Sequence, residues 1–592
     1  MELNSVTIQA IWQRLISVVD EAATGLMRTA FTPSVKEYHD FCCGLFDRDA
    51  NMLAHSTATT PAFLGIIPEV MRNFIRLHPP DTLEPGDQLI TNDPWLASGH
   101  LIDITVAAPI FHRGRVVGYG VCIVHHLDMG GRLATLESKS IYEEGLRIPI
   151  VKLYDAGRLN RTVFDFMKAN LRVPDKVLGD VQGQLVANHV CSRGLVRVLE
   201  EYGLEGLEDV GREIMQRTDA SLRNKIRSLP EGTYRNSVRL PPFLQCPGEI
   251  EIKVAVTIRD GSVLIDYDGT TGEVGAAINC VFNMTRSYSA YPIKLAFDPS
   301  VPNNDGCMRA IAVAAPEGSL VNCRPPAATW GRVRISHLLP EIIFGALEPV
   351  MPEAILAANG GSSANEVYLH GYRRRDGRPF LGIQAHSGGF GASHRFDGYS
   401  ALCFPNNTRN IPLEVSENES PIRFLRKELM PDTSGPGYRR GGAGQEVEFA
   451  VLSGEQGPAD FIEGSVQLNG RSAESDFPLY GRCGGGNGRG GGLWLNDTLI
   501  EHGIYRRFWP GDRVRFQIGG GGGFGEAFTR EPERVAADVR AGLVSVAAAR
   551  EDYGVAVDPE TGIVEDKATR ALRLAREASP AAPRRVAAHS GD

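Results

Sequence analysis

The sequence predicts a multidomain α+β protein: a mixed α/β N-terminal domain with long helices, then a β-rich region with glycine loops and short C-terminal helices. Three observations support this fold class. A chain of 592 residues is too long for a single hydrophobic core. Apolar residues recur at helical spacing in much of the N-terminal part. The 66 glycines, many of them in the C-terminal third, indicate tight turns between short strands.

The predicted N-terminal α/β domain covers residues 1–230. It opens with an amphipathic helix from residue 5 to about 30, which Asn4 or Ser5 can cap. Further elements are expected as a strand over 41–46, a helix over 68–77, a strand over 88–91, a hairpin over 104–124 and helices between 163 and 229. Leu229-Pro230-Glu231-Gly232 ends the helical part and marks the first domain boundary.

The rest of the chain divides into four further segments. They are a central α+β domain (231–358), a β-rich glycine-loop domain (359–530), a C-terminal helical segment (531–577) and a disordered tail (578–592). Within them, strands are expected over 250–258, 263–267 and 311–314, and helices over 283–297, 335–350, 531–541 and 545–552. The glycine clusters have no fixed period, so no repeats are predicted.

Composition argues against several classes of protein. The net charge of −9 and the pI of about 5.9 argue against a general nucleic-acid-binding surface. No apolar run approaches the roughly 20 residues that span a bilayer. The N-terminus has neither the basic start nor the apolar core of a signal peptide, so a cytoplasmic location is expected. The ten cysteines include no CxxC, which favours free thiols over a zinc ribbon.

The stretch with the most chemistry is the predicted hairpin. Its strands run over 104–111 and 115–124, and the turn signal is His112-Arg113-Gly114. Five residues that can bind metals or transfer protons lie just outside the strand cores: His100, Asp103, His125, His126 and Asp128. Each of them taken singly is more often a solvated or hydrogen-bonded residue. Together on one hairpin they favour a metal site, because imidazole and carboxylate groups are ligands for Zn, Mn or Fe.

The turn decides which of these residues share a face. A two-residue loop at Arg113-Gly114 would place Ile102 opposite His125, with His100 diagonal to it on the same face. A three-residue loop would shift the pairing by one and place Asp103 opposite His125. His100 and Asp103 cannot share one face of a regular strand, so the chain would have to leave the strand before His100, at Ser98-Gly99.

Two sites outside the hairpin complete the list of candidate ligands and acids. Asp40 stands directly before the strand over 41–46, where it can point into a cleft. Glu143 and Glu144 follow the hairpin, and one of them could be a ligand or a general base. For all three, a solvated or turn carboxylate is the simpler interpretation when each is taken alone.

A rival chemistry is nucleotide binding by the glycine loops. Residues 520–525 match GxGxxG and follow a predicted strand. However, no helix opens on the last glycine, since Pro532 follows closely, and a chain so rich in glycine matches this pattern easily. Neither GxxxxGK[ST] nor GxSxG occurs, which argues against a phosphate loop and a serine hydrolase. No cofactor-binding loop is therefore predicted.

Several segments together resemble one known family. They are HDFCCGLFD (39–47), NDPWLASGHLIDI (92–104), VHHLDMGG (124–131), EEGLRIP (143–149), VPNNDGCMRAIAVAAPEGS (301–319), GRVRISHLLPEIIFGAL (331–347), HSGGFGAS (386–393) and the glycine-rich run from 519 to 555. The chain resembles the hydantoinase B/oxoprolinase family, which includes subunits or halves of N-methylhydantoinase, 5-oxoprolinase and caprolactamase. Subunits of acetone and acetophenone carboxylase are also similar.

The resemblance implies a metal-containing subunit of an ATP-dependent enzyme. It maps the metal ligands onto Asp40, His100, Asp103 and His125, with Zn, Mn or Fe as the divalent ion. A hydantoinase A-type partner subunit would bind ATP, and an A2B2 hetero-oligomer acting on a small molecule is expected. No nucleic-acid or membrane partner is expected.

The reaction implied is ATP-dependent opening of a cyclic amide such as a hydantoin, a lactam or an oxoproline-like ring. The partner would phosphorylate the amide oxygen, and the metal would acidify water. Asp128 or Glu144 could act as the general base, and His126 is a further catalytic candidate. Two alternatives remain open: a subunit of an ATP-dependent ketone carboxylase, and a non-catalytic scaffold that stabilises the partner.

Overall fold

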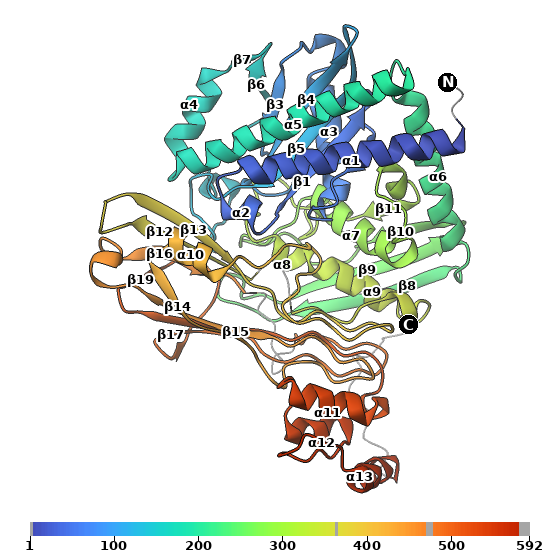
Figure 1. The fold of residues 1–592 in the computed structure, drawn as a ribbon, viewed down its shortest axis with the longest axis vertical. Helices are drawn as coiled ribbons and strands as arrows, with labels where there is room; N and C mark the ends of the chain where they lie inside the picture. Colours follow the sequence, from blue (N-terminus) through green and yellow to red (C-terminus); the bar gives the residue numbers. More distant parts are fainter. Residues whose placement is uncertain (1–3, 361–364, 469–476, 579–592) are drawn as a thin grey trace.

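The computed structural model describes residues 4–360, 365–468 and 477–578. In these ranges helices and four β-sheets form a multidomain α+β architecture, which confirms the predicted fold class (Figure 1). The tail predicted from residue 578 lies, beyond Ala578, outside the described residues. None of the helices in the described part of the chain has both the length and the apolar character that a membrane crossing needs.

A seven-stranded antiparallel sheet organises the N-terminal part, in the order β2-β1-β5-β4-β3-β6-β7. Its strands are β1 (Phe41–Asp47), β2 (Met52–His55), β3 (Gln88–Thr91), β4 (Asp103–His112), β5 (Arg115–His125), β6 (Val151–Asp155) and β7 (Arg158–Leu159). Alternate residues of β5 enter two different cores: Val121 and Ile123 pack on one face, Cys122 and Val124 on the other. The central strands are therefore apolar throughout, because helices cover both faces.

The N-terminal part also contains helices, the longest of which pack on this sheet. The helices are α1 (Ser5–Thr29), α2 (Pro33–Lys36), α3 (Phe63–Leu77), α4 (Arg161–Asn170), α5 (Pro174–Tyr202) and α6 (Glu208–Ile226). The side chain of Asn4 accepts hydrogen bonds from Val6 N and Thr7 N, so the predicted cap of α1 is confirmed. The helix predicted to begin at Pro68 begins five residues earlier, since α3 starts at Phe63. Figure 1 shows α1 and α5 side by side across the sheet.

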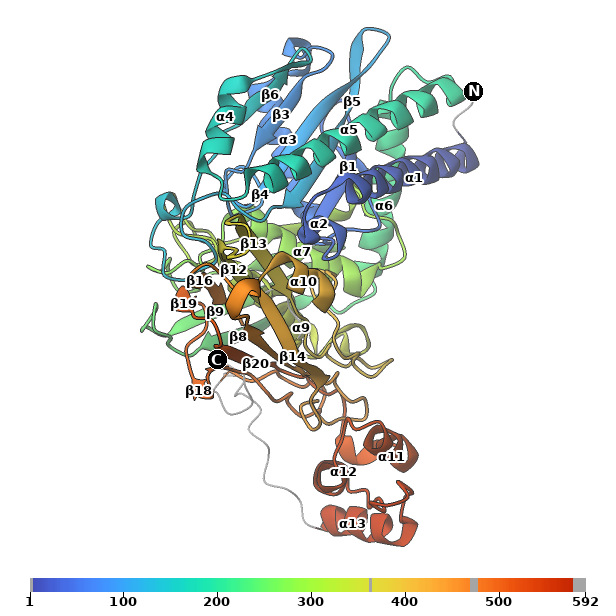
Figure 2. The same ribbon diagram turned by 60° about the vertical axis from the view of Figure 1, so that its left-hand side comes forward.

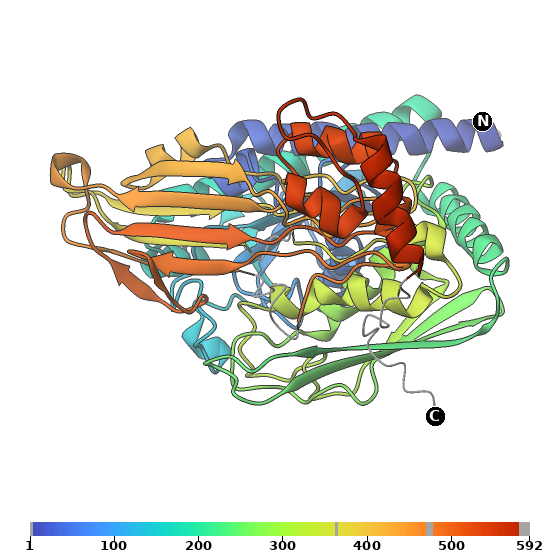
Figure 3. The same ribbon diagram turned by 90° about the horizontal axis from the view of Figure 1, so that it is seen from below.

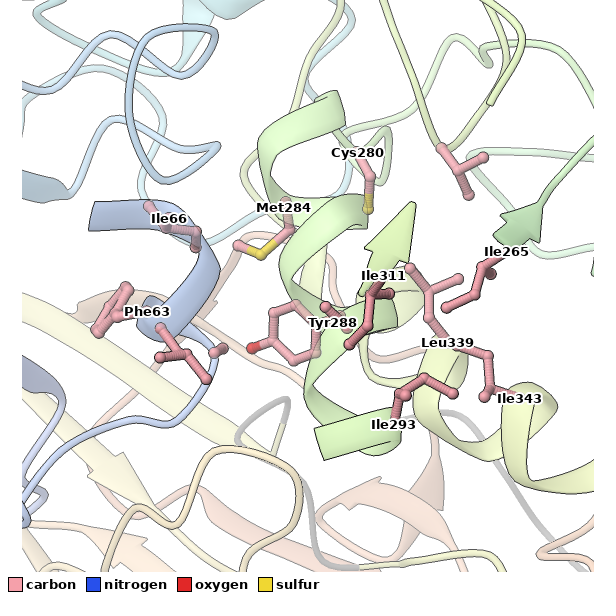
Figure 4. Packing of buried hydrophobic residues seen from close by; sticks show 14 of the residues in the cluster. Phe63, Ile66, Ile265, Cys280, Met284, Tyr288, Ile293, Ile311, Leu339 and Ile343 are labelled. Atoms are coloured by element: carbon pink, nitrogen blue, oxygen red, sulfur yellow. The ribbon is translucent and has the colours of Figure 1, made fainter. Parts of the chain in front are cut away.

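A second sheet, in the order β11-β10-β9-β8, forms the central part. The strands of this sheet are β8 (Gly232–Leu240), β9 (Ile250–Arg259), β10 (Ser262–Asp266) and β11 (Ile311–Ala314). The helices of the central part are α7 (Phe282–Phe297), α8 (Val333–Ser336) and α9 (Leu338–Leu347). Helix α7 joins this sheet to the N-terminal part. Figure 4 shows Met284 and Tyr288 of α7 facing Phe63 and Ile66 of α3. The helix predicted over 335–350 is two short helices, α8 and α9, which meet at His337.

Two further sheets follow, in the orders β13-β12-β16-β19 and β14-β15-β20-β17-β18. Their elements are β12 (Glu366–Tyr372), β13 (Pro379–Ala385), α10 (Leu413–Glu419), β14 (Ile422–Leu429), β15 (Gln445–Val451), β16 (Ile462–Val466), β17 (Gly492–Leu495), β18 (Thr498–Leu499), β19 (Arg506–Phe508) and β20 (Arg513–Ile518). The chain also contributes α11 (Pro532–Arg540), α12 (Val546–Tyr553) and α13 (Asp566–Ala578) at one end of the molecule (Figures 2 and 3). Helices α11 and α12 share an apolar core of their own.

The glycine clusters form one structure, which we call the glycine bundle (residues 357–360, 388–391, 434–444, 480–489 and 519–525). Its segments run beside one another and exchange main-chain hydrogen bonds. Gly521 N donates to Gly442 O at 2.9 Å, and Gly522 N donates to Ala358 O at 2.8 Å. A Cβ on Gly521 would lie 2.1 Å from Phe390 O, far inside contact distance. Glycine is used here because the main chains pack too closely for any side chain.

The bundle also accounts for the GxGxxG match. The amides of residues 520–525 donate to main-chain oxygens of neighbouring segments, at 2.8 to 3.0 Å. A phosphate-binding loop needs such amides directed at the ligand. In this chain they donate to main-chain oxygens within the bundle instead.

Candidate metal centre

Three neighbouring strands bring the candidate ligands to one end of the N-terminal sheet. Strand β1 pairs with β5 from Phe41 opposite Val124, and His125 N donates to Asp40 O at 3.0 Å. Strand β5 pairs with β4 so that His125 is opposite Asp103. Asp40, His125 and Asp103 therefore lie side by side, contributed by three adjacent strand ends.

The hairpin register combines features of both predicted alternatives. The loop is the two-residue turn Arg113-Gly114, since His112 pairs with Arg115. Nevertheless Asp103 is opposite His125, as the three-residue loop had predicted. A β-bulge reconciles the two, because the register shifts by one between Ile110 and Phe111. Local turn signals do not reveal such a bulge.

His100 reaches the site from the loop before β4. The strand begins only at Asp103, and Gly99 has a φ of +93°, a conformation that favours glycine. This agrees with the expectation that the chain leaves the strand at Ser98-Gly99. Ring atom Nε2 of His100 then lies 2.8 Å from Asp103 Oδ1. One ligand atom each from His100, Asp103 and His125 lie within 4.8 Å of one another.

The protonation of His100 tests whether these residues fit a cation. Trp330 O, 3.3 Å from His100 Nδ1, is an acceptor only, so Nδ1 must carry the proton. A neutral His100 then directs the lone pair of Nε2 at Asp103 Oδ1. Nε2 makes no hydrogen bond of good geometry to any residue that the structure describes. Two electron-pair donors 2.8 Å apart repel each other, so the donor set fits a cation held between them.

The remaining carboxylate, Asp40, lies at the edge of this group. Its Oδ2 is 3.8 Å from His125 Nδ1, and its Oδ1 accepts a hydrogen bond from Thr60 Oγ1 at 2.8 Å. On the other side, Asp103 Oδ2 accepts from Ser98 Oγ at 2.7 Å. Both carboxylates are thus oriented by hydroxyl groups, as metal-binding carboxylates commonly are.

Burial and the neighbouring charges set the protonation of the group. Burial lowers the pKa of His100 to about 4, and the Arg332 guanidinium adds to this effect. Burial also opposes a charge on His125, but the hydrogen bond to Asp103 and the Asp40 carboxylate raise its pKa to about 9. Burial would raise the pKa of Asp103, but its contacts with the two histidines and with Arg332 hold it well below the usual value. His100 is therefore neutral at pH 7, the form that binds a metal.

The centre opens into a pocket of about 450 Å³, a volume that includes space open to solvent. The N-terminal part (1–230), the central part (231–358) and the β-rich part (359–530) all contribute to its walls. The residues that line it are Asp40, Thr60, Ala62, Phe63, Ile66, His100, Asp103, His125, Met284, Tyr288, Trp330, Arg332, Val333, Glu366 and Asn406. Charged and polar groups gather at the strand ends. The facing wall, from α3 and α7, is apolar apart from the Tyr288 hydroxyl (Figure 4).

The three residues predicted to be catalytic have other partners. His126 Nε2 lies 3.2 Å from Gln184 Oε1. Asp128 accepts hydrogen bonds from Gly130 N at 2.9 Å and from the Arg172 guanidinium at 2.7 Å. Glu144 accepts from two amides of the central segment, and burial raises its pKa to about 8. Their catalytic roles stay predictions, and these contacts by themselves position loops.

Four functional candidates were missed by sequence reasoning: Trp330, Arg332, Glu366 and Tyr368. Arg332 donates to Asp103 Oδ2 at 2.9 Å, and Tyr368 OH lies 2.9 Å from His125 Nε2. Glu366 accepts from Tyr38 OH at 3.0 Å. These residues are more than 200 positions from the hairpin, so no local pattern links them to it. The one available signal was the segment 331–347, which contains Arg332 and carried part of the family resemblance.

Comparison with known proteins supplies further findings. Residues 4–527 match the family described as Hydantoinase B/oxoprolinase. A subunit of a putative D-/L-hydantoinase from Pseudomonas sp. (strain NS671) is 29% identical over 97% of this chain and 98% of its own. The beta subunit of caprolactamase from Pseudomonas jessenii is 28% identical over 97% of this chain and 99% of its own.

Solved structures give a similar result. The crystal structure of ATP-dependent caprolactamase from Pseudomonas jessenii has a TM-score of 0.84 and 27% identity, covering 97% of this chain and 100% of that one. A nucleotide-free structure of acetone carboxylase has a TM-score of 0.83 at 20% identity, covering 98% of this chain and 84% of that one. The second likeness shows a shared fold.

Proposed function

This chain belongs to the hydantoinase B/oxoprolinase family, and we propose that it is the metal-containing subunit of an ATP-dependent enzyme that opens a cyclic amide. The substrate class would be a hydantoin, a lactam or an oxoproline-like ring. A hydantoinase A-type partner subunit would bind and use ATP, in a complex for which we propose A2B2 stoichiometry.

One observation carries this proposal: the convergence of His100 Nε2, Asp103 Oδ1 and His125 Nδ1 at the polar end of the pocket. Nitrogen and oxygen donors in this combination suit Zn, Mn or Fe. Asp40 would complete the set from the neighbouring strand. A divalent ion held there would supply Lewis-acid chemistry, acidifying water and polarising a carbonyl group.

The chain's own residues would bind and orient the substrate. Phe63, Ile66 and Met284 form an apolar wall that can pack against the methylene or alkyl face of a small ring. The polar end of the pocket would then face the amide group. Because most of the lining residues are buried, the pocket also limits the access of bulk water to an activated amide.

Supporting residues hold the ligands in place. Tyr368 OH is positioned to accept a hydrogen bond from His125 Nε2, which would leave Nδ1 of that ring as the ligand atom. Ser98 and Thr60 hold one oxygen each of Asp103 and Asp40. These contacts fix ring tautomers and carboxylate orientations before a substrate arrives, which keeps the cost of reorganisation low.

The need for a partner rests on what the sequence lacks and on how its relatives are named. The sequence has no GxxxxGK[ST] motif, and the amides of its GxGxxG match are used within the glycine bundle. Similar proteins of the same length are named as single subunits of a hydantoinase or a caprolactamase. Phosphorylation of the amide oxygen is therefore assigned to the partner.

The test is to purify the chain with its co-expressed partner, measure bound metals by elemental analysis and screen ATP hydrolysis over hydantoins, lactams and oxoproline. We expect about one divalent ion per chain and ATP hydrolysis coupled to ring opening. Removal of the metal by a chelator should abolish ring opening, and restoring the metal should recover it. Full ring opening by a metal-free complex would refute the proposal.

The same preparation tests the two alternatives. A ketone carboxylase would hydrolyse ATP with acetone or acetophenone only when bicarbonate is present. A non-catalytic scaffold would carry no stoichiometric metal, and the partner alone would then turn over the substrate. We expect neither result.

A further inference from the structure

A short turn of the central segment brings two residues with unused hydrogen-bond donors to the pocket wall. Trp330 and Arg332 both line it, with exposed fractions of 6% and 3%. Trp330 Nε1 and Arg332 Nη1 find no hydrogen-bond partner within the described ranges. Burying an N–H group without an acceptor is unfavourable, more so when the group is charged. Two such groups on the wall of one pocket indicate a ligand that supplies the acceptor.

The guanidinium group cannot turn to find another partner. Arg332 Nε donates to Ser98 O at 3.0 Å, and Nη2 donates to Asp103 Oδ2 at 2.9 Å. These two bonds fix the plane of the group and leave Nη1 as its free corner. Gly99 makes room for it, because a Cβ on Gly99 would lie 3.0 Å from both Cδ and Nε of Arg332.

The indole is held equally firmly. The amides of Thr329 and Trp330 both donate to Glu144 Oε1 at 2.9 Å, so a buried carboxylate anchors the turn. The Trp330 ring packs edge-on against Tyr368, with ring centroids 5.6 Å apart. The two donors therefore keep their positions without a ligand, as a preorganised binding site requires.

We propose that Trp330 Nε1 and Arg332 Nη1 form an oxyanion-binding subsite beside the metal ligands, which takes an anionic oxygen of the substrate. The oxygen belongs either to the phosphoryl group of an activated amide or to a carboxylate that the substrate already carries. Both present a charged acceptor to a guanidinium corner and an indole N–H. This inference rests on the proposed function and narrows its substrate class.

The opposite wall limits the rest of the ligand. Phe63, Ile66 and Met284 offer only apolar contacts (Figure 4). A ligand that satisfies both ends is a small molecule with an apolar ring face and one anionic group. The subsite would orient the anionic group toward Trp330 and Arg332. These two residues contact the proposed metal ligands His100 and Asp103.

The test measures the binding of inorganic phosphate and of acetate to the full chain by titration calorimetry, with the metal content determined for each sample. Trp330→Phe removes the N–H group and keeps an aromatic ring. We expect it to weaken the binding of at least one probe by about tenfold. Arg332→Lys, which loses the Nη1 corner, should weaken the same probe at least as much. Trp509→Phe is the matched control, since Trp509 is half exposed and outside the pocket lining, and its affinity should be unchanged.

The two probes separate the two sources of the oxygen. Binding of phosphate that depends on Trp330 assigns the subsite to the phosphoryl group, and binding of acetate that depends on it assigns the subsite to a substrate carboxylate. The proposal is overturned if neither probe binds, or if Trp330→Phe leaves both affinities unchanged.

A measurement on the unsubstituted protein covers the case in which the variants do not fold. The chain has five tryptophans, so isotope labelling of the indole nitrogens gives five N–H resonances. We expect one of them to shift on addition of phosphate or acetate, and no shift with either probe would overturn the proposal. Loss of ring-opening activity in the complex, with probe binding still dependent on Trp330, would refute the proposed function and leave the subsite standing.

Discussion

The candidate metal centre and the glycine bundle are both buried, and both are assembled from segments far apart in the chain, yet their hydrogen-bonding groups are paired to different extents. In the bundle, the amides of residues 520–525 each donate to a main-chain oxygen. At the centre, nitrogens of His100, Trp330 and Arg332 have no partner in the described part of the chain. Pairing of all these main-chain amides indicates a structural role, whereas buried donors and lone pairs left over beside a cavity indicate a ligand.

The strongest test of this contrast removes a ligand at the centre. His100→Ala should lose most of the bound metal and reduce ATP-coupled ring opening by at least about 1,000-fold, since a ligand that anchors the ion is gone. Elemental analysis and steady-state kinetics of the complex measure the two effects. The fold should be retained, because His100 lies in a loop and, among the residues described, its ring makes one hydrogen bond, to Trp330 O.

The control for this variant is His189→Ala, which removes an exposed histidine of α5. It should keep full metal content and turnover. If His100→Ala retained the metal and full activity, the distinction between the two regions would not hold.

The next test introduces a side chain into the bundle. In Gly521→Ala the new Cβ would lie 2.1 Å from Phe390 O, and main chain cannot move aside as a flexible side chain can. We expect a loss of about 3 kcal/mol or more of stability, or failure to obtain folded protein. Chemical denaturation followed by circular dichroism measures it.

Gly248→Ala is the matched control, because a Cβ there meets nothing within 4 Å. Its stability should stay within about 0.5 kcal/mol of the parent. Equal stability of the two variants would show that the bundle tolerates side chains, and the packing explanation for its glycines would then be wrong.

The comparison also shows what the sequence can and cannot predict. Strands β1, β4 and β5 were predictable because apolar runs and a turn signal are local. This was enough to place Asp40 and the hairpin residues among the candidates, and the family resemblance narrowed the proposed ligands to Asp40, His100, Asp103 and His125. The bulge at Ile110 was not, since it depends on packing across the sheet.

Long-range packing was equally hidden. Trp330 and Tyr368 meet the hairpin only after the central and β-rich segments have folded against it. The glycine clusters were interpreted as turns, whereas they are close-packed extended segments, and nothing in a cluster specifies which distant cluster it will contact. Local patterns predicted candidate ligands, and tertiary contacts supplied their surroundings.

A smaller effect is expected one contact away from the metal. Tyr368→Phe removes the hydroxyl that lies 2.9 Å from His125 Nε2 and should lower metal affinity by about 10- to 100-fold with little change in stability. Competition with a chromogenic chelator measures the affinity. Tyr119→Phe is the control: Tyr119 is buried in β5, and its hydroxyl has no hydrogen-bond partner among the residues described. Equal metal affinities of the two variants would show that the Tyr368 hydroxyl does not support metal binding.

The smallest effect on turnover is expected at Glu144. The sequence suggested this residue as a general base, and its carboxylate anchors the turn that carries Trp330. Burial raises the pKa of Glu144 from 4.5 to about 8. A carboxyl group with a raised folded-state pKa contributes stability that is present below pH 4.5 and is lost as the pH rises through 8. Glu144→Gln keeps an acceptor for the two amides and cannot ionise. The stability of the variant relative to the parent should therefore increase by about 2 to 3 kcal/mol between pH 5.5 and pH 7.5.

Turnover of the same variant separates an anchor from a base. If Glu144 only anchors the turn, Glu144→Gln should retain the rate of ring opening within about threefold. If Glu144 is a general base, the substitution should reduce that rate by about 100-fold or more. Thermal denaturation across the pH range and kinetics at pH 7.5 can be measured on one preparation. A 100-fold loss of turnover without a pH-dependent gain in stability would place proton transfer at Glu144, on the far side of the Trp330 turn, and would extend the reacting region beyond the pocket at the strand ends.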